Sequence, residues 1–227
     1  MWNLIRKFRS IPEEKKIIVY GKLSFIKSLF YFCFKVIVGL VFRSWFLIAI
    51  AIYSLFIASV KNSCSSGLKD NKENINDIYS YIRGGAVLAV SSLFYIAYSV
   101  FQIFIPSNTK YNMIIAIAIA AFAAYSIGMS LWGVICARGK TMLIKQYKLT
   151  NFATAFNNIV LAQIAILSFM TIENVALYNG IIGIIAGLIV MIIGLYLLFD
   201  GIRKKRKYYQ LVKKYPSILK YINEHYN

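Results

Sequence analysis

The strongest structural signal in the chain is GIIGIIAGLIVMIIGLYLLFDGIRKKRKYY, residues 180–209. It carries no charge before Asp200, and an apolar helix of about 20 residues, rising ~1.5 Å per residue, spans the ~30 Å hydrocarbon core of a bilayer. An unbroken basic run, residues 203–207, follows almost directly. An apolar helix with one cationic end predicts a membrane crossing whose basic end faces the cytoplasm.

The composition places the whole chain in the same class. Hydrophobic residues make up 59% of its 227 residues and occur in long blocks, whereas soluble domains are about 45–50% apolar. The 26 Lys and Arg residues against 8 Asp and Glu residues give a net charge of +18. Because these charges flank the apolar blocks, we expect contact with anionic lipid headgroups and not with nucleic acid. The sequence predicts an all-α integral membrane protein, a polytopic helical bundle in a lipid bilayer.

Six hydrophobic segments form the predicted transmembrane domain, residues 23–200. They are 24–42, 45–60, 84–105, 113–137, 152–172 and 180–199. A basic N-terminal segment, 1–22, and a basic, partly helical tail, 201–227, flank this domain. The connector 61–83 is rich in Ser and Asn, which predicts a loop, with its second half from about Asn74 helical.

The basic residues indicate how the block 23–60 is threaded. Two arms with a turn at Arg43 place every Lys and Arg on one side of the membrane except Lys35, Arg43 and Lys110. A single crossing divides the charges between both sides, against the positive-inside rule. Two arms leave Lys35 inside the membrane, at a cost of about 2.5–3.5 kcal/mol. We therefore predict three hairpins with both termini cytoplasmic. The alternative is five crossings with 24–42 as an interfacial amphipathic helix.

Small residues at helical spacing predict where helices approach each other closely. They are Gly180, Gly183, Gly187 and Gly194 in the last segment, and Ala116, Ala120, Ala124 and Gly128 in the fourth. We expect both stripes to contact other helices. The sequence leaves open whether those helices belong to the same chain or to another chain of a homo- or hetero-oligomer.

Polar residues inside two segments predict either interhelical hydrogen bonds or the lining of a solute path. They are Ser91, Tyr95, Ser99 and Gln102 in the third segment, and Asn157, Asn158 and Gln163 in the fifth. Hydrogen bonding alone fits a non-enzymatic membrane subunit or scaffold, which we favour. A continuous path between the two segments would instead indicate a small permease or channel.

Signatures of catalysis and metal binding are weak. The sole histidine, His225, lies close to the end of the sequence, away from every apolar segment, so a histidine metal cluster or an intramembrane Ser–His pair is not expected. The cysteines, Cys33, Cys64 and Cys136, have no metal-type spacing and predict no structural disulfide. We expect no enzyme activity, no metal and no cofactor.

The basic run after the last segment is expected to contact anionic lipid headgroups. Its members are Arg203, Lys204, Lys205, Arg206 and Lys207. Each basic residue near an anionic surface contributes about 1 kcal/mol of attraction. A simple topology anchor explains the same run without a specific lipid site.

Two short patterns mark the ends of apolar segments. Phe42-Arg43-Ser44-Trp45-Phe46 joins two apolar arms, and Ala137-Arg138 with Lys148-Leu149-Thr150-Asn151 leads into a later segment. In these patterns the chain resembles a group of multi-pass bacterial membrane proteins of unassigned function, over about residues 23–200. The resemblance implies a bacterial cytoplasmic membrane and a hairpin at Arg43. It implies no substrate and no catalytic residue.

Overall fold

The computed structural model describes residues 18–19, 22–23, 25–26, 29–30, 32–33, 36–37, 40, 45–68, 75–104, 113–137, 139–167 and 175–214. The secondary-structure elements of that part are helices, among them α3 Trp45–Gly67, α4 Ile75–Phe104, α5 Met113–Cys136, α6 Met142–Leu167 and α7 Val175–Lys214. The predicted all-α class is confirmed.

Four of these helices are long and apolar enough to cross a membrane, namely α4, α5 from Ala116 onward, α6 and α7. The chain is thus built as a membrane protein. The predicted count of six segments is not confirmed, because most of 24–42 lies outside the described residues and α3 is not among the four. The described residues between 18 and 40 are helical, and several carry exposed apolar side chains, including Phe30 and Leu40.

The described helices extend beyond the predicted apolar segments. α3 continues to Gly67, so the prediction of a loop from residue 61 is wrong for its first turns. Cys64 and Ser65 are fully buried there, and the Ser65 hydroxyl donates to the Asn62 carbonyl of the same helix. Burial against other helices therefore outweighs the weak helix propensity of these small polar residues. α6 likewise begins ten residues before the predicted segment 152–172.

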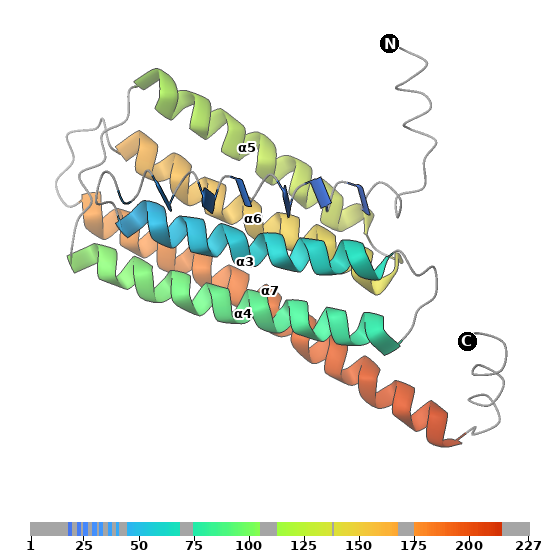
Figure 1. The fold of residues 1–227 in the computed structure, drawn as a ribbon. Coiled ribbons are helices and arrows are strands. Elements are labelled where there is room, and N and C mark those ends of the chain that lie inside the picture. Colours follow the sequence, from blue (N-terminus) through green and yellow to red (C-terminus); the bar gives the residue numbers. More distant parts are fainter. Residues whose placement is uncertain are drawn as a thin grey trace, which may run out of the picture.

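The five helices run in alternating directions along the bundle (Figure 1). α5 lies at the outside and, among the described helices, contacts only α6. α4 and α7 make the most extensive helix contact. They are antiparallel, because Ile103 at the end of α4 meets Gly180 near the start of α7, and Ile82 near the start of α4 meets Gly201.

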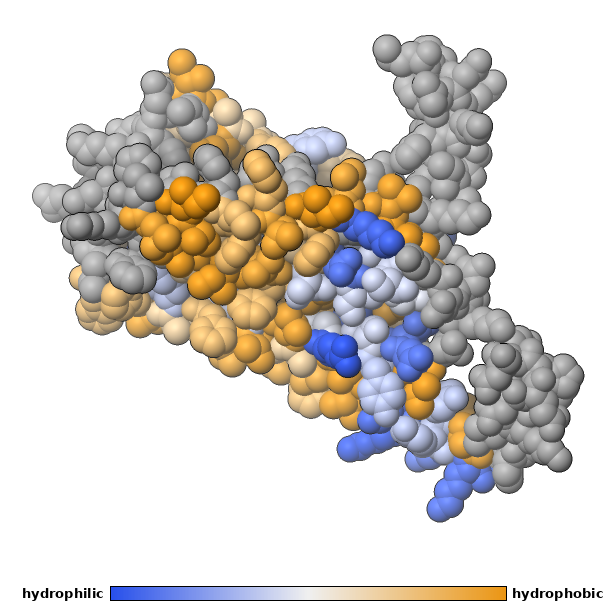
Figure 2. Space-filling model, viewed as in Figure 1, coloured by the Kyte–Doolittle hydropathy of each residue, from blue (hydrophilic) through white to orange (hydrophobic). Residues whose placement is uncertain are grey.

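The charged residues of the described helices gather toward one end of the bundle, which we name the basic end. Within residues 45–214 the described basic residues are Lys61, Arg83, Lys140, Lys145, Lys148, Arg203, Lys204, Lys205, Arg206, Lys207, Lys213 and Lys214. Figure 2 shows the hydrophilic side chains concentrated at this end and an apolar surface over the rest of the visible face. The apolar part of each helix therefore lies in one common band, as a bilayer requires.

Glycines allow the backbones of α4 and α7 to touch. A Cβ added at Gly194 would lie 2.6 Å from the Ala89 nitrogen, and one added at Gly85 would lie 2.6 Å from the Leu198 nitrogen. Both distances are far below ordinary van der Waals contact, and the obstructing atoms are backbone. The structure places the whole predicted stripe of the last segment against α4: Gly180, Gly183, Gly187 and Gly194. Close approach of this kind supplies the dispersion contacts that hold helices together in lipid.

Gly194→Ala tests this contact. We expect a loss of about 1–3 kcal/mol of unfolding free energy, the usual cost of overpacking, because the new methyl group meets the backbone of α4. Gly133→Ala is the matched control, since a Cβ added there meets only the flexible Lys148 side chain, at 3.3 Å. It should be neutral or add up to ~1 kcal/mol through better helix propensity. Equilibrium unfolding in detergent micelles, followed by circular dichroism, measures both, and equal effects would contradict the contact.

Candidate functional site

The predicted polar face of α4 is buried. Its members are Ser91, Tyr95, Ser99 and Gln102. The hydroxyls of Ser91 and Ser99 donate to carbonyls of their own helix, at Leu88 and Tyr95, over 3.0 and 2.8 Å. Ser99 also lies directly against Gly183 of α7. Helix packing thus occupies part of this face, and two of its hydroxyls are satisfied without a solute.

The polar residues of α6 reach two different helices. The Asn158 amide donates to the Ser126 hydroxyl of α5 over 3.0 Å, and the Gln163 amide donates to the Tyr178 carbonyl of α7 over 3.2 Å. Asn157 is buried, and its Oδ1 has no hydrogen-bond partner. The described hydrogen bonds do not join the polar sets of α4 and α6 to each other. Asn158 and Gln163 therefore act in separate helix contacts.

A cavity of about 300 Å³ lies between α3 and α4 at the predicted polar face. Ser91 and Tyr95 line it together with Tyr53 and Tyr98. The rings of Tyr53 and Tyr95 stack with their centroids 4.9 Å apart. Sequence reasoning missed Tyr53, because a single tyrosine in an apolar segment carries no periodic signal. The cavity is largely aromatic and apolar, so it suits an apolar group better than a hydrated ion.

The small residues of α5 do not all meet α6. Ala116 is buried and Ala120 is half-buried, whereas Ala124 and Gly128 are exposed. The contact with α6 includes instead Ser130, whose hydroxyl donates to the Asn151 carbonyl, and Gly133, whose added Cβ would lie 3.3 Å from the Lys148 side chain. The predicted stripe therefore begins at a buried position, Ala116, and ends at an exposed one, Gly128.

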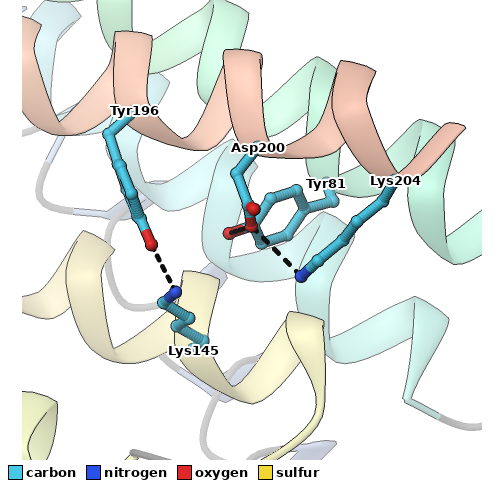
Figure 3. A network of polar contacts seen from close by, with 5 residues as sticks. All are labelled: Tyr81, Lys145, Tyr196, Asp200 and Lys204. Atoms are coloured by element: carbon cyan, nitrogen blue, oxygen red, sulfur yellow. Dashed lines mark hydrogen bonds and ion pairs between the residues drawn. The ribbon is translucent and has the colours of Figure 1, made fainter. Parts of the chain in front are cut away.

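A network of tyrosines and charges joins three helices at the basic end (Figure 3). Asp200 accepts a hydrogen bond from the Tyr81 hydroxyl over 3.1 Å and forms an ion pair with Lys204 at 3.1 Å. Lys145 of α6 donates to the Tyr196 hydroxyl of α7. Burial alone would raise the pKa of Asp200, but its hydrogen bonds and the charges of Lys204 and Lys145 outweigh burial and lower that pKa. Asp200 is therefore ionised, and it connects Tyr81 of α4 with Lys204 of α7.

A buried amide fixes α6 against α4 beside this network. Gln146 is fully buried, and its Nε2 donates to the Tyr81 carbonyl over 3.0 Å. Gly84 makes room for the amide, because a side chain at this position would occupy the space of Gln146 Nε2. Neither residue was singled out from the sequence. A single Gly and a single Gln on separate helices predict no contact until the helices are docked.

Lys61 is a charged group removed from water. It lies just beyond the predicted span 45–60, and only 9% of the residue is exposed. No described acidic side chain pairs with it. Burial lowers the pKa of its ammonium group from 10.5 to about 8. The folded state therefore carries a destabilising charge at neutral pH.

No protein-family model matches this chain, and no curated protein matches it significantly. Among the described residues no group of three His, Cys, Asp or Glu side chains could hold a metal ion. The function must therefore be inferred from the helix contacts and surfaces described above.

Lys61→Met tests the energetic effect of the buried charge. The folded pKa of about 8 lies below the ordinary 10.5, so the unfolded chain binds more protons between these values. Wild-type stability should rise from pH 8 to 10.5, and this rise should disappear in Lys61→Met. The variant should also be more stable than wild type at pH 7, by roughly 1–3 kcal/mol. Unfolding in detergent across this pH range is the measurement. Exposed Lys207→Met is the control, and identical pH dependence in both variants would contradict the assignment.

Proposed function

We propose that this protein is a non-enzymatic membrane subunit that self-associates in the bilayer through the outer face of α5. One observation carries the proposal: Gly128 is the only glycine in a described helix that no described part of the chain covers. Ala124, one turn away, is exposed on the same face. A smooth strip of this kind facing lipid is suited to the backbone of a second helix.

The internal architecture of the chain supports this reading. α4 and α7 associate through glycines covered by the opposite helix, at Gly85 and Gly194. α5 offers small residues at the same helical spacing but contacts only α6 among the described helices. Large exposed side chains border the strip, including Tyr125 and Trp132. In a pair of α5 helices these side chains would pack beside the close backbone contact and add dispersion contacts.

The proposal includes an orientation. The basic end would face the cytoplasm of a bacterial cell, with both termini on that side, as the positive-inside rule favours. The last part of α7, with Lys213 and Lys214 in its final turn, would then extend from the membrane into the cytoplasm. A second chain joined at α5 would present two such basic extensions to anionic lipid.

The permease alternative is less well supported. It needs the polar residues of α4 and α6 to share one path, but Ser99 faces α7 and Asn158 bonds to α5. Ser91 and Ser99 are already satisfied by their own helix. These contacts favour a bundle held together by its polar groups over one that opens along them.

Gly128→Ile tests self-association. The isoleucine has open space in one chain, so the fold of the monomer should be unaffected. It should push a second α5 helix away and weaken association at least tenfold. Ala97→Ile, at an exposed position of α4, is the matched control and should associate like wild type. Energy transfer between labelled chains in lipid vesicles at several protein-to-lipid ratios measures this. A monomeric wild type, or unchanged association of Gly128→Ile, would overturn the proposal.

A further inference from the structure

A cavity of about 510 Å³ lies at the basic end, where α7 continues past the start of α4. Figure 1 shows this part of α7 extending beyond the other helices. Ile82 still touches Gly201, and beyond that contact the two helices meet through the hydroxyls of Tyr79 and Tyr209. Ile82 and Ile202 form the apolar side of the cavity. The cavity thus opens where the glycine contact ends.

The polar side of the cavity is cationic and rich in hydrogen-bond donors. Lys205 and Arg206 line it together with Tyr79, Tyr209 and Gln210, and none of the described lining residues is acidic. The Lys205 ammonium nitrogen lies 4.5 Å from the centroid of the Tyr79 ring. The hydroxyls of Tyr79 and Tyr209 are 3.2 Å apart. Contact with the aromatic ring holds the Lys205 ammonium near the cavity, and the occupant that this lining favours is an anion.

The five cations of the basic run are not equivalent. Lys204 pairs with Asp200 and lies over the Tyr81 ring, away from the cavity. Arg203 and Lys207 are exposed and do not line it. Only Lys205 and Arg206 do so. The fold therefore selects two members of the run for one defined site.

The depth of the cavity along α7 indicates where its ligand comes from. Ile202 follows the apolar segment 180–199 almost directly, so the cavity lies at the boundary between hydrocarbon and water. Lipid headgroups occupy this level, with their phosphates just outside the glycerol and acyl chains. Apolar Ile82 and Ile202 beside Lys205 and Arg206 match that order.

We propose that this cavity binds the headgroup of one anionic phospholipid. Lys205 and Arg206 pair with the phosphate, to which the planar Arg206 guanidinium offers two parallel donors. One of the Tyr79 and Tyr209 hydroxyls donates to the other, and the second hydroxyl donates a hydrogen bond to a headgroup oxygen. The glycerol and the first acyl carbons lie on Ile82 and Ile202. The site is independent of self-association through α5.

Native mass spectrometry of the full-length protein, titrated in detergent with phosphatidylglycerol or phosphatidylcholine, tests the proposal. Lys205→Gln with Arg206→Gln removes the two cavity cations. Arg203→Gln with Lys207→Gln removes two neighbouring exposed cations and is the matched control, with the same net charge. We expect the cavity pair to weaken the binding of the first phosphatidylglycerol at least tenfold more than the control pair. Equal losses in the two pairs would show diffuse attraction only and would overturn the site.

Two further arms identify the chemistry of the ligand. Tyr79→Phe with Tyr209→Phe keeps both rings and removes both hydroxyls, and it should weaken phosphatidylglycerol binding about tenfold, as expected for the loss of a hydrogen bond to a charged group. Inorganic phosphate added in excess should leave the bound lipid in place. Displacement of the lipid by phosphate alone would assign the cavity to a free anion and would overturn the lipid proposal. Equal affinities for phosphatidylcholine and phosphatidylglycerol would also overturn the lipid proposal.

Discussion

The backbone contact between α4 and α7 is the constraint on which the rest of the structure depends. In lipid there is no hydrophobic force between apolar helices, so close packing and hydrogen bonds must hold them. Gly85 and Gly194 allow each helix to reach the backbone of the other, and no larger residue fits at either position. This contact sets the register in which Asp200 meets Tyr81. The last glycine of this contact, Gly201, lies beside Ile82 and Ile202, which line the cationic cavity.

α3 and α6 each contact a member of this pair directly, whereas α5 reaches the pair only through α6 among the described helices. α6 is anchored by the amide of Gln146, which reaches the Tyr81 carbonyl through the space that Gly84 leaves. α5 is attached only to α6 among the described helices, and most of its surface is exposed. A chain that conceals most of its helix glycines within the monomer and leaves Gly128 uncovered is suited to assembly. Asn158 and Gln163 of α6 bond to neighbouring helices, whereas Ser91 and Ser99 of α4 bond to their own helix.

Hydropathy alone located the apolar parts of the described helices, because a bilayer demands long uncharged segments. It did not locate their ends. Residues 61–67 read as loop by composition but are helical, since Cys64 and Ser65 are buried by neighbouring helices. The glycine spacing on the last segment indicated a close contact but not its partner, because helix pairing depends on the folded arrangement. Ala124 and Gly128 carry the same kind of signal and face outward.

The candidate site was only partly visible in the sequence. The basic run indicated lipid, yet nothing in it distinguished Lys205 and Arg206 from Lys204. That distinction comes from Asp200 on one side of α7 and Tyr79 on the other. Lys61 likewise looked like a flanking charge, and only the docked helices show that it is buried. Which face of a helix a charge occupies can be predicted, whereas what covers that face cannot.

The register of α4 against α7 can be measured most directly by disulfide cross-linking in the membrane, with the native cysteines replaced by alanine. The pairs Ile82→Cys with Gly201→Cys and Ile96→Cys with Gly187→Cys test both ends of the contact, because each of these glycines meets its partner isoleucine. Both pairs should cross-link. Ile82→Cys with Gly187→Cys is displaced by about 21 Å along the helix and should not, since a disulfide needs Cα atoms within about 7 Å. Cross-linking of the displaced pair without the two matched pairs would contradict the account.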